Sequence, residues 1–293
     1  MNSVIDYAGL FPPAGLEMPE AVSNYARYYS GELSWILGRF ILQISRLEEF
    51  EESVGRLQAS RGESPRWRLS VLGTEDPEAD LKGITEFKRR SAAKTNSDRI
   101  VIDAIELKAG TAEVMRRAMA VLSDHLEVYL EIPISDDATK LIAAVAEKHG
   151  RAKVRTGGTT AGMFPSPTQL AGFILPCVKT RISFKATSGL HHALRSVHPL
   201  TYEAAGPSCI MHGFLNVLLA SAFAYAGADE GRVAAILSEE SAEAFRFDDS
   251  GILWRNQRLG INQLHDMRTR LFTSFGSCSF EEPISEMKAL KLL

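Results

Sequence analysis

Short runs of β-branched and apolar residues recur along the first two thirds of the chain, with helical patterns between them. Several of these runs are almost continuously apolar, which is typical of parallel strands buried on both faces. Strands that alternate with helices predict βα units, because a parallel connection must bring the chain back across the sheet. The expected strands are Val4–Ala8, Ile36–Gln43, Trp67–Leu72, Ile100–Leu107, Glu127–Ile132, Ala152–Arg155 and Ile182–Ala186.

The alternation of predicted strands and helices ends after His192. Ala- and Leu-rich patterns predict helices over Ser208–Tyr225 and Gly231–Ala244, and turn residues predict a hairpin over Phe245–Trp254. An eighth strand is either this hairpin or Thr273–Ser277. We therefore expect an α/β fold, a (β/α)8 TIM barrel, as one domain over residues 1–293 with an insertion of helices and a hairpin at about 195–265, before the last strand.

Composition narrows the class of protein. The net charge of −3 lacks the basic surplus that nucleic-acid binding usually requires. The N-terminal residues lack the basic stretch of a signal peptide, and the longest apolar run is too short to cross a bilayer. We expect a cytoplasmic protein with neither nucleic-acid nor membrane partners. The apolar segment 211–225 is expected to be a core helix, with a homo-oligomer interface as the alternative.

Charged residues inside otherwise apolar strands are the most informative ones, because burying a charge is costly. Most of them lie near the carboxyl ends of their strands, where the active sites of barrel enzymes are built. One interpretation is a set of ion pairs that fix the register, such as Lys153 with Glu131. Six such residues on four successive strands favour a functional cluster: Asp103, Glu106, Glu131, Lys153, Arg155 and Lys185.

Lys153 and Lys185 lie 32 residues apart, the length of one βα unit, so adjacent strands are expected to carry them. A neutral lysine attacks carbonyl groups, and desolvation or a neighbouring cation favours the neutral form. Lys185 and Arg155 are placed to supply that cation. A nearby carboxylate would transfer protons during imine formation.

The motifs around these lysines resemble the deoxyribose-phosphate aldolase branch of the class I aldolase barrels. The resemblance begins at Ile5-Asp6-Tyr7-Ala8-Gly9-Leu10-Phe11-Pro12 and continues through Glu106-Leu107-Lys108-Ala109-Gly110 and Glu131-Ile132-Pro133. The segment Lys153–Gly157 resembles the Schiff-base motif of that family, and Lys185–Gly189 resembles the motif of the next strand. These motifs follow the order of the family over roughly residues 4–193, about two thirds of the chain.

The resemblance implies a lyase that needs no cofactor and no metal. Lys153 would form the Schiff base, and Lys185 would lower its pKa. The position of the catalytic aspartate of the family is occupied by Arg99, so Asp103 or Glu131 would have to move the protons.

The expected substrate is a small aldehyde or keto compound. The phosphate-binding loops of the family are only partly matched, so the substrate is either phosphorylated or not. The residues expected to bind it are Asp6, Arg155, Thr156, Gly157, Ser188, Gly189 and His191.

Two other functions stay open at this point. Arg99 and the incomplete phosphate loops suit a barrel that has lost the reaction and binds a small acidic ligand. The four histidines between His191 and His212 suit a metal-dependent lyase or hydrolase, although no pair has the spacing of metal ligands on one helix face.

Overall fold

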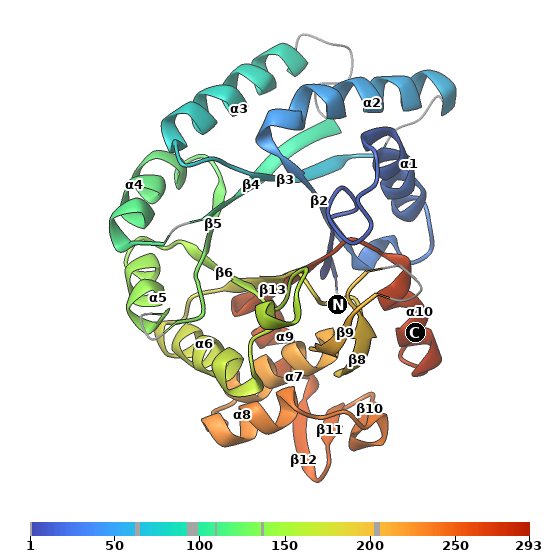
Figure 1. Cartoon of the computed structure of the whole chain (residues 1–293), viewed down its shortest axis with the longest axis vertical. Coiled ribbons are helices and arrows are strands. Elements are labelled where there is room, and N and C mark those ends of the chain that lie inside the picture. The colour runs from blue at the N-terminus through green and yellow to red at the C-terminus, as the bar shows by residue number, and fades with distance from the viewer. Residues whose placement is uncertain (1, 62–64, 93–98, 109, 136–137, 202–205) are drawn as a thin grey trace.

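The computed structural model describes residues 2–61, 65–92, 99–108, 110–135, 138–201 and 206–293. Within these residues, eight parallel strands close into a barrel in the order β1-β13-β7-β6-β5-β4-β3-β2. Figure 1 looks into this barrel and shows the helices as a ring outside it. The predicted (β/α)8 TIM barrel is therefore confirmed.

The barrel strands follow the predicted ranges closely, and the helices that alternate with them cover the outer face of the sheet. The strands are β1 (Ile5–Tyr7), β2 (Leu37–Gln43), β3 (Trp67–Leu72), β4 (Ile100–Lys108), β5 (Glu127–Glu131), β6 (Arg151–Arg155), β7 (Phe184–Thr187) and β13 (Phe272–Ser277). The helices outside them are α1 (Met18–Tyr29), α2 (Leu47–Arg61), α3 (Pro77–Ala92), α4 (Ala112–Leu122), α5 (Ala138–Ala146), α6 (Pro167–Thr180), α9 (Ile261–Arg270) and α10 (Glu281–Ala289).

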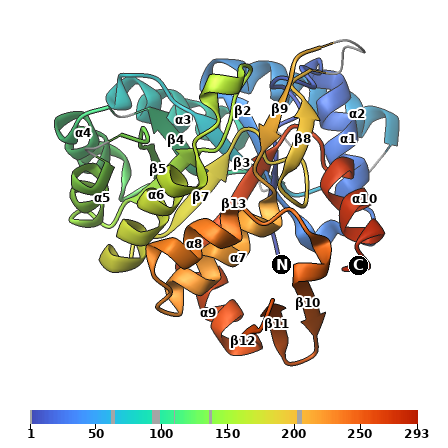
Figure 2. The same ribbon diagram turned by 60° about the horizontal axis from the view of Figure 1, so that its bottom comes forward.

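The eighth barrel strand is β13, which pairs with β7 on one side and β1 on the other. The alternative, the Phe245–Trp254 hairpin, forms β10 (Phe245–Asp248) and β11 (Gly251–Trp254). With β12 (Gln257–Gly260) these strands make a separate antiparallel sheet. Figure 2 shows this sheet extending away from the barrel.

The predicted helix over Ser208–Tyr225 is wrong in its first part. Ser208–Met211 is strand β9, which pairs with β8 (Ser196–Pro199), and helix α7 covers Phe214–Tyr225. Gly213 has extended backbone angles, and a side chain there would collide with the Ala193 carbonyl. Gly213 is thus an extended residue at a close approach of two backbones, and the helix begins only after it. Residues 202–205 of the predicted insertion lie outside the described residues.

Helix α7 is a core helix. Every residue from Phe214 to Ala224 is buried within this chain. Helix α8 (Glu230–Leu237) packs against both α7 and α6. The insertion is thereby fixed to the barrel, and it leaves the β8–β9 hairpin at the barrel mouth.

Candidate active site

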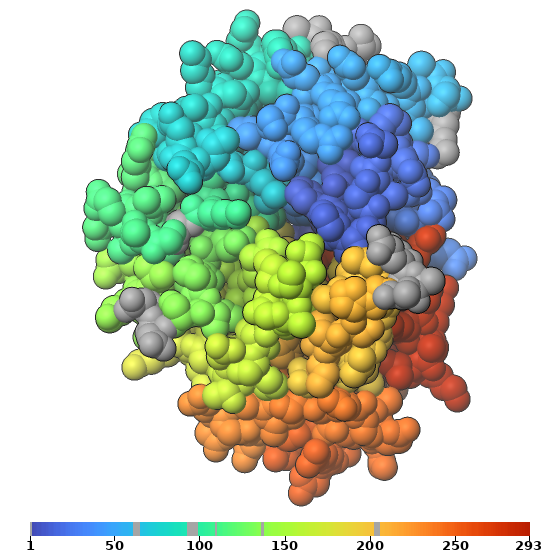
Figure 3. All heavy atoms as spheres, in the orientation of Figure 1, coloured from blue at the N-terminus to red at the C-terminus, as the bar shows by residue number. Residues whose placement is uncertain are grey.

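A cavity of about 370 Å³ opens at the carboxyl ends of the barrel strands. Its floor includes Glu106, Lys153 and Lys185, and its walls come from the loops that follow the strands. In Figure 3, the segment around Ala161–Met163 and the β8–β9 hairpin lie side by side on the face turned to the viewer, and β9 contacts this segment. The cavity thus combines a charged floor with partly covered walls.

The two lysines are direct neighbours in the barrel sheet. Lys153 of β6 is in register with Lys185 of β7, so both side chains point to the same side of the sheet. Both are buried, and both line the cavity. The amines meet at a single carboxylate, because Glu106 Oε2 lies 2.9 Å from Lys153 Nζ and Glu106 Oε1 lies 2.7 Å from Lys185 Nζ.

Each lysine has a second carboxylate partner. Lys153 Nζ lies 2.9 Å from Glu131 Oε2, the ion pair considered from the sequence, and Lys185 Nζ lies 2.5 Å from Asp6 Oδ2. The hydroxyl of Ser70 donates a hydrogen bond to Glu106, and that of Ser274 donates one to Asp6. We call Asp6, Glu106, Glu131, Lys153 and Lys185 the lysine cluster.

The charges of the lysine cluster stabilise each other. Burial alone would lower the pKa of Lys185, but the Asp6 and Glu106 carboxylates outweigh it and raise that pKa above its ordinary value. Burial would likewise raise the pKa of Glu106, yet Lys153 and Lys185 hold it well below its ordinary value. Lys185 is therefore an ammonium and Glu106 a carboxylate at neutral pH.

Asp103, a predicted proton carrier, belongs to a different cluster. Its carboxylate accepts hydrogen bonds from Arg39 at 2.5 Å and from Arg68 at 2.7 Å, and it does not line the cavity. The register between β3 and β4 shifts at this point, from Leu69 opposite Ile102 to Ser70 opposite Ala104. Alternation along the sequence would put Asp103 and Glu106, three residues apart, on opposite faces, and the extra residue at this bulge changes that count. The two carboxylates are separated by their distance along β4, with Asp103 nearer its amino end.

The predicted substrate-binding residues divide into two groups. Arg155, Ser188, Gly189 and His191 line the cavity, whereas Asp6, Thr156 and Gly157 do not. The Thr156 hydroxyl donates to the Ser188 carbonyl at 2.6 Å and so fixes the loop after β7.

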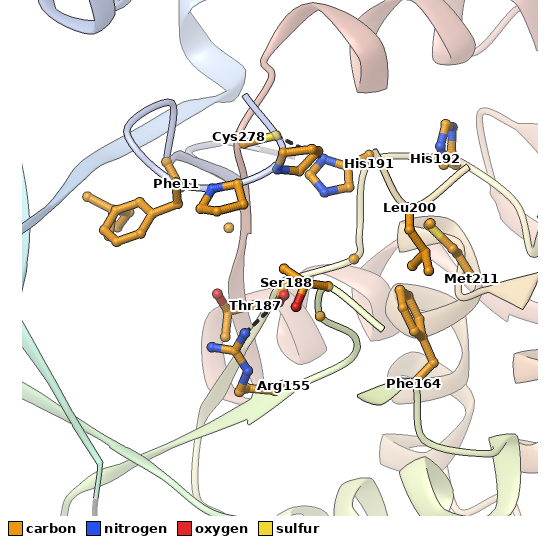
Figure 4. Close-up of a pocket in the computed structure, with 18 of the residues that line it drawn as sticks. Phe11, Arg155, Phe164, Thr187, Ser188, His191, His192, Leu200, Met211 and Cys278 are labelled. Carbon is orange, nitrogen blue, oxygen red and sulfur yellow. Dashed lines mark hydrogen bonds between the residues drawn. The ribbon is translucent and has the colours of Figure 1, made fainter. Parts of the chain in front are cut away.

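Arg155 is a cation in the cavity wall whose guanidinium can bind a ligand. Its guanidinium donates one hydrogen bond to the Ser188 hydroxyl at 3.2 Å, as Figure 4 shows. Within the described residues, no carboxylate forms an ion pair with it. An acidic group on a ligand would complete this arrangement.

His191 lies across the cavity from Arg155 in Figure 4, beside Cys278. Its Nδ1 atom is 3.6 Å from Cys278 Sγ, 3.3 Å from Ser277 Oγ and 3.8 Å from the Glu282 carboxylate. Burial lowers the pKa of His191 to about 4, with help from His192 and His198. The imidazole is therefore neutral at physiological pH.

Three of the four histidines between His191 and His212 lie together, because the rings of His192 and His198 stack with their centres 3.2 Å apart and the ring of His191 is 6.5 Å from that of His192. His192 contacts Glu286, His198 contacts Ser196, and His212 donates to the Pro165 carbonyl. Among the residues that the structure describes, no group of three or more His, Cys, Asp or Glu side chains is arranged to hold a metal ion.

Sequence reasoning noticed Glu106 as a buried charge but gave it no role. In the structure it is the residue that joins the two lysines. The sequence signal for Glu106 is its position in an apolar strand, two residues before the strand ends. In the structure this position lies at the cavity floor.

No family model matches the sequence, and no curated protein is significantly similar to it. In the described part of the chain, the helices are all too short or too polar to cross a membrane. The (β/α)8 fold is compatible with an aldolase or lyase, and the argument for a particular chemistry depends on the site itself.

Proposed function

We propose that this chain is a class I aldolase-like lyase in which Lys153 forms a Schiff base with a small aldehyde or keto substrate. The observation that carries the proposal is the position of Lys153. Its amine lies in the floor of a cavity, 2.9 Å from each of two carboxylates. A buried amine that is accessible to a small molecule and adjoins proton acceptors suits imine chemistry.

The residues of the lysine cluster have different roles in the proposed reaction. The Lys153 nitrogen must be neutral before it can attack, and Glu131 is the better candidate to take its proton, because two lysines hold the pKa of Glu106 far below its ordinary value and make it a weak base. The amine then adds to the carbonyl carbon, a C–N bond forms, and the hydroxyl of the carbinolamine leaves as water with the proton returned by Glu131. Lys185 and Glu106 are positioning residues in this scheme.

Carbon–carbon cleavage follows from the iminium group. Its positive nitrogen withdraws electrons from the neighbouring C–C bond, while a base removes the proton of the β-hydroxyl group. One fragment leaves as an aldehyde, and the other stays on Lys153 as an enamine. The base returns its proton to the enamine carbon, and water then adds to the iminium carbon and releases the product from the Lys153 amine. The reverse sequence of steps forms the bond.

Arg155 indicates the substrate class. Its guanidinium, with the Ser188 hydroxyl beside it, would bind a carboxylate or a phosphate of the substrate. An aldehyde or keto compound with one acidic group would therefore reach from Arg155 to Lys153.

Reductive trapping tests the proposal. The protein is mixed with small aldehydes and keto acids, with and without phosphate groups, and sodium borohydride is added. We expect an added mass on the peptide that contains Lys153, and none in Lys153→Arg, which keeps the positive charge. Lys108→Arg is the matched control, because Lys108 is exposed at the end of β4. An adduct that persists in Lys153→Arg, or none with the whole panel, rejects this chemistry.

A second candidate is a barrel that binds a small acidic ligand without reaction. The specific observation in its favour is the stable charge state of Lys185 and Glu106 together with the guanidinium of Arg155 in the wall. It predicts that calorimetry detects binding of small acids that is lost in Arg155→Gln, while borohydride yields no adduct with any of them.

A further inference from the structure

We infer that Cys278 and His191 form a second nucleophilic site in this cavity, in which the Cys278 thiol adds reversibly to an aldehyde. The pair is independent of the lysine cluster in its residues and in its chemistry. It lies on the opposite side of the cavity from Arg155 in Figure 4.

Three side chains from separate elements meet at this place. Cys278 follows β13, His191 lies in the loop after β7, and Glu282 lies in the first turn of α10. Cys278 Sγ is within hydrogen-bond distance of His191 Nδ1, at 3.6 Å, and a Glu282 oxygen lies 3.8 Å from the same nitrogen. All three residues line the cavity.

The imidazole lies where it can take the thiol proton, because its Nδ1 atom is 3.6 Å from Cys278 Sγ. Burial lowers the pKa of His191 to about 4, so the ring is neutral and has a free nitrogen at physiological pH, although the same burial makes it a weak base. When it takes the proton, the nearby Glu282 carboxylate stabilises the imidazolium that results. The neutral imidazole therefore acts as a general base that takes the thiol proton while the sulfur attacks.

The other two cysteines lack this environment. Cys177 is fully buried in α6, where burial raises the pKa of its thiol well above the ordinary value. Cys209 on β9 is more exposed than Cys278, and burial raises the pKa of its thiol too. Exposure alone would make Cys209 the most reactive thiol, so the three cysteines give an internal test.

Addition to an aldehyde needs no further reactant. The sulfur attacks the carbonyl carbon, an S–C bond forms, and the C=O double bond becomes a single bond. The proton passes from the thiol to His191 and from His191 to the new hydroxyl group. The product is a hemithioacetal that dissociates by the reverse steps. The site would therefore hold an aldehyde near the cavity mouth.

The first experiment measures alkylation of the full chain by iodoacetamide, with peptide mass spectrometry to follow each cysteine. We expect Cys278 to react about tenfold faster than the more exposed Cys209, and His191→Asn to slow Cys278 about tenfold while Cys209 keeps its rate. Glu282→Gln is a milder second variant, expected to slow Cys278 by about threefold. A faster Cys209, or a Cys278 rate that neither variant changes, overturns the inference.

The second experiment tests aldehyde capture with glyoxylate and propionaldehyde as probes. Each is expected to protect Cys278 from iodoacetamide in a concentration-dependent manner, and to do so equally in Lys153→Arg. Protection that disappears in Lys153→Arg would mean that the lysine holds the aldehyde, which overturns capture by the thiol. Because Lys153→Arg removes imine formation, failure of this inference and failure of the proposed function are distinguishable.

Discussion

The barrel interior contains two charged clusters whose chemistry differs. Three residues of the lysine cluster, Glu106, Lys153 and Lys185, lie at the cavity floor. The other, which we call the arginine cluster, comes from the first halves of β2 to β6. It joins Arg39 to Asp103 and Glu127, with Arg68 on Asp103 and Arg151 on Glu127. In both clusters every buried charge has a partner of opposite sign.

The two clusters differ in the type of cation, arginine or lysine, and in whether a small molecule in the cavity can reach it. Burial would lower the pKa of Arg39, but Asp6, Tyr129 and Asp103 raise it further above its ordinary value, so this guanidinium stays charged. Arg39, Asp103 and Glu127 do not line the cavity at the mouth. Lysine can lose its proton and become a nucleophile, whereas arginine cannot. Charge at a strand interior therefore indicates function only where the cation can react and a substrate can reach it.

Removal of Lys185 is expected to give the largest effect on stability. Lys185→Met leaves Asp6 and Glu106 as buried carboxylates with fewer partners, at a cost of about 3–5 kcal/mol. Urea denaturation at pH 7 measures it. The double variant Lys185→Met/Asp6→Asn should recover part of the loss, because it removes one of the unpaired charges. A loss below about 1 kcal/mol in the single variant would contradict the described pairing.

The arginine cluster provides the matched test at the other end of the barrel. Arg39→Met leaves Asp103 and Glu127 without their buried partner, and we expect a loss of about 3 kcal/mol. The borohydride adduct per folded molecule should change less than about twofold, because no residue of the cavity is removed. If Arg39→Met abolishes the adduct in protein that is still folded, the separation of the two clusters is wrong.

A fall in pH is expected to destabilise the protein first through His212, which lies between β9 and α7, and only at lower pH through either charged cluster. Burial lowers the pKa of His212 to about 4, with the Pro165 hydrogen bond opposing and Arg195 assisting this shift. An unfolded histidine has a pKa of about 6.5, so between these values only the unfolded state binds the proton. Stability should fall as the pH drops from 6.5 toward 4, by up to about 1.4 kcal/mol per pH unit for this group.

The variant His212→Gln isolates that contribution, because glutamine can still donate to the Pro165 carbonyl. Urea midpoints at pH 7, 6 and 5 should shift less with pH in the variant than in the natural chain. Equal pH dependence in both proteins would show that His212 titrates alike in the folded and unfolded states. Glu106, whose pKa is lowered, contributes stability that is lost only at lower pH, below its unfolded value of about 4.5.

The smallest expected effect concerns the helix that follows β6. Ser166 caps α6 with a complete capping box, its hydroxyl accepting from the Gln169 N–H. Ser166→Ala should cost about 1 kcal/mol, and Ser166→Asp should restore most of it. The adduct per folded molecule should be unchanged in both, measured by the same trapping assay. A large loss of adduct would mean that the cap also positions the cavity wall.

The seven predicted strands are confirmed because buried parallel strands leave a local signal, continuous apolar runs with turns at their ends. The eighth strand was left open between two ranges, since Phe272–Ser277 is short and its Ser and Gly residues resemble a loop. The sequence of strand β9 predicts the start of a helix, because an apolar run without a clear period does not distinguish a strand from a helix.

The candidate site was predicted in part. Lys153 and Lys185 were placed on neighbouring strands by the length of a βα unit, which is a local quantity. The sequence does not assign Asp103 and Glu106 to separate clusters, because the cations that each carboxylate meets come from other strands of the barrel and depend on how the strands pair. His191 and Cys278 are 87 positions apart, so no spacing in the sequence could have paired them.

The sequence by itself therefore determined the alternation of strands and helices, the barrel, and the two lysines on adjacent strands. Periodicity and unit length depend only on residues near each other in the chain. The tertiary structure decided which carboxylate lies between the lysines, which charges are separated at the far end of the barrel, and which thiol meets an imidazole. These depend on strand register and barrel closure, which bring residues together regardless of their separation in sequence.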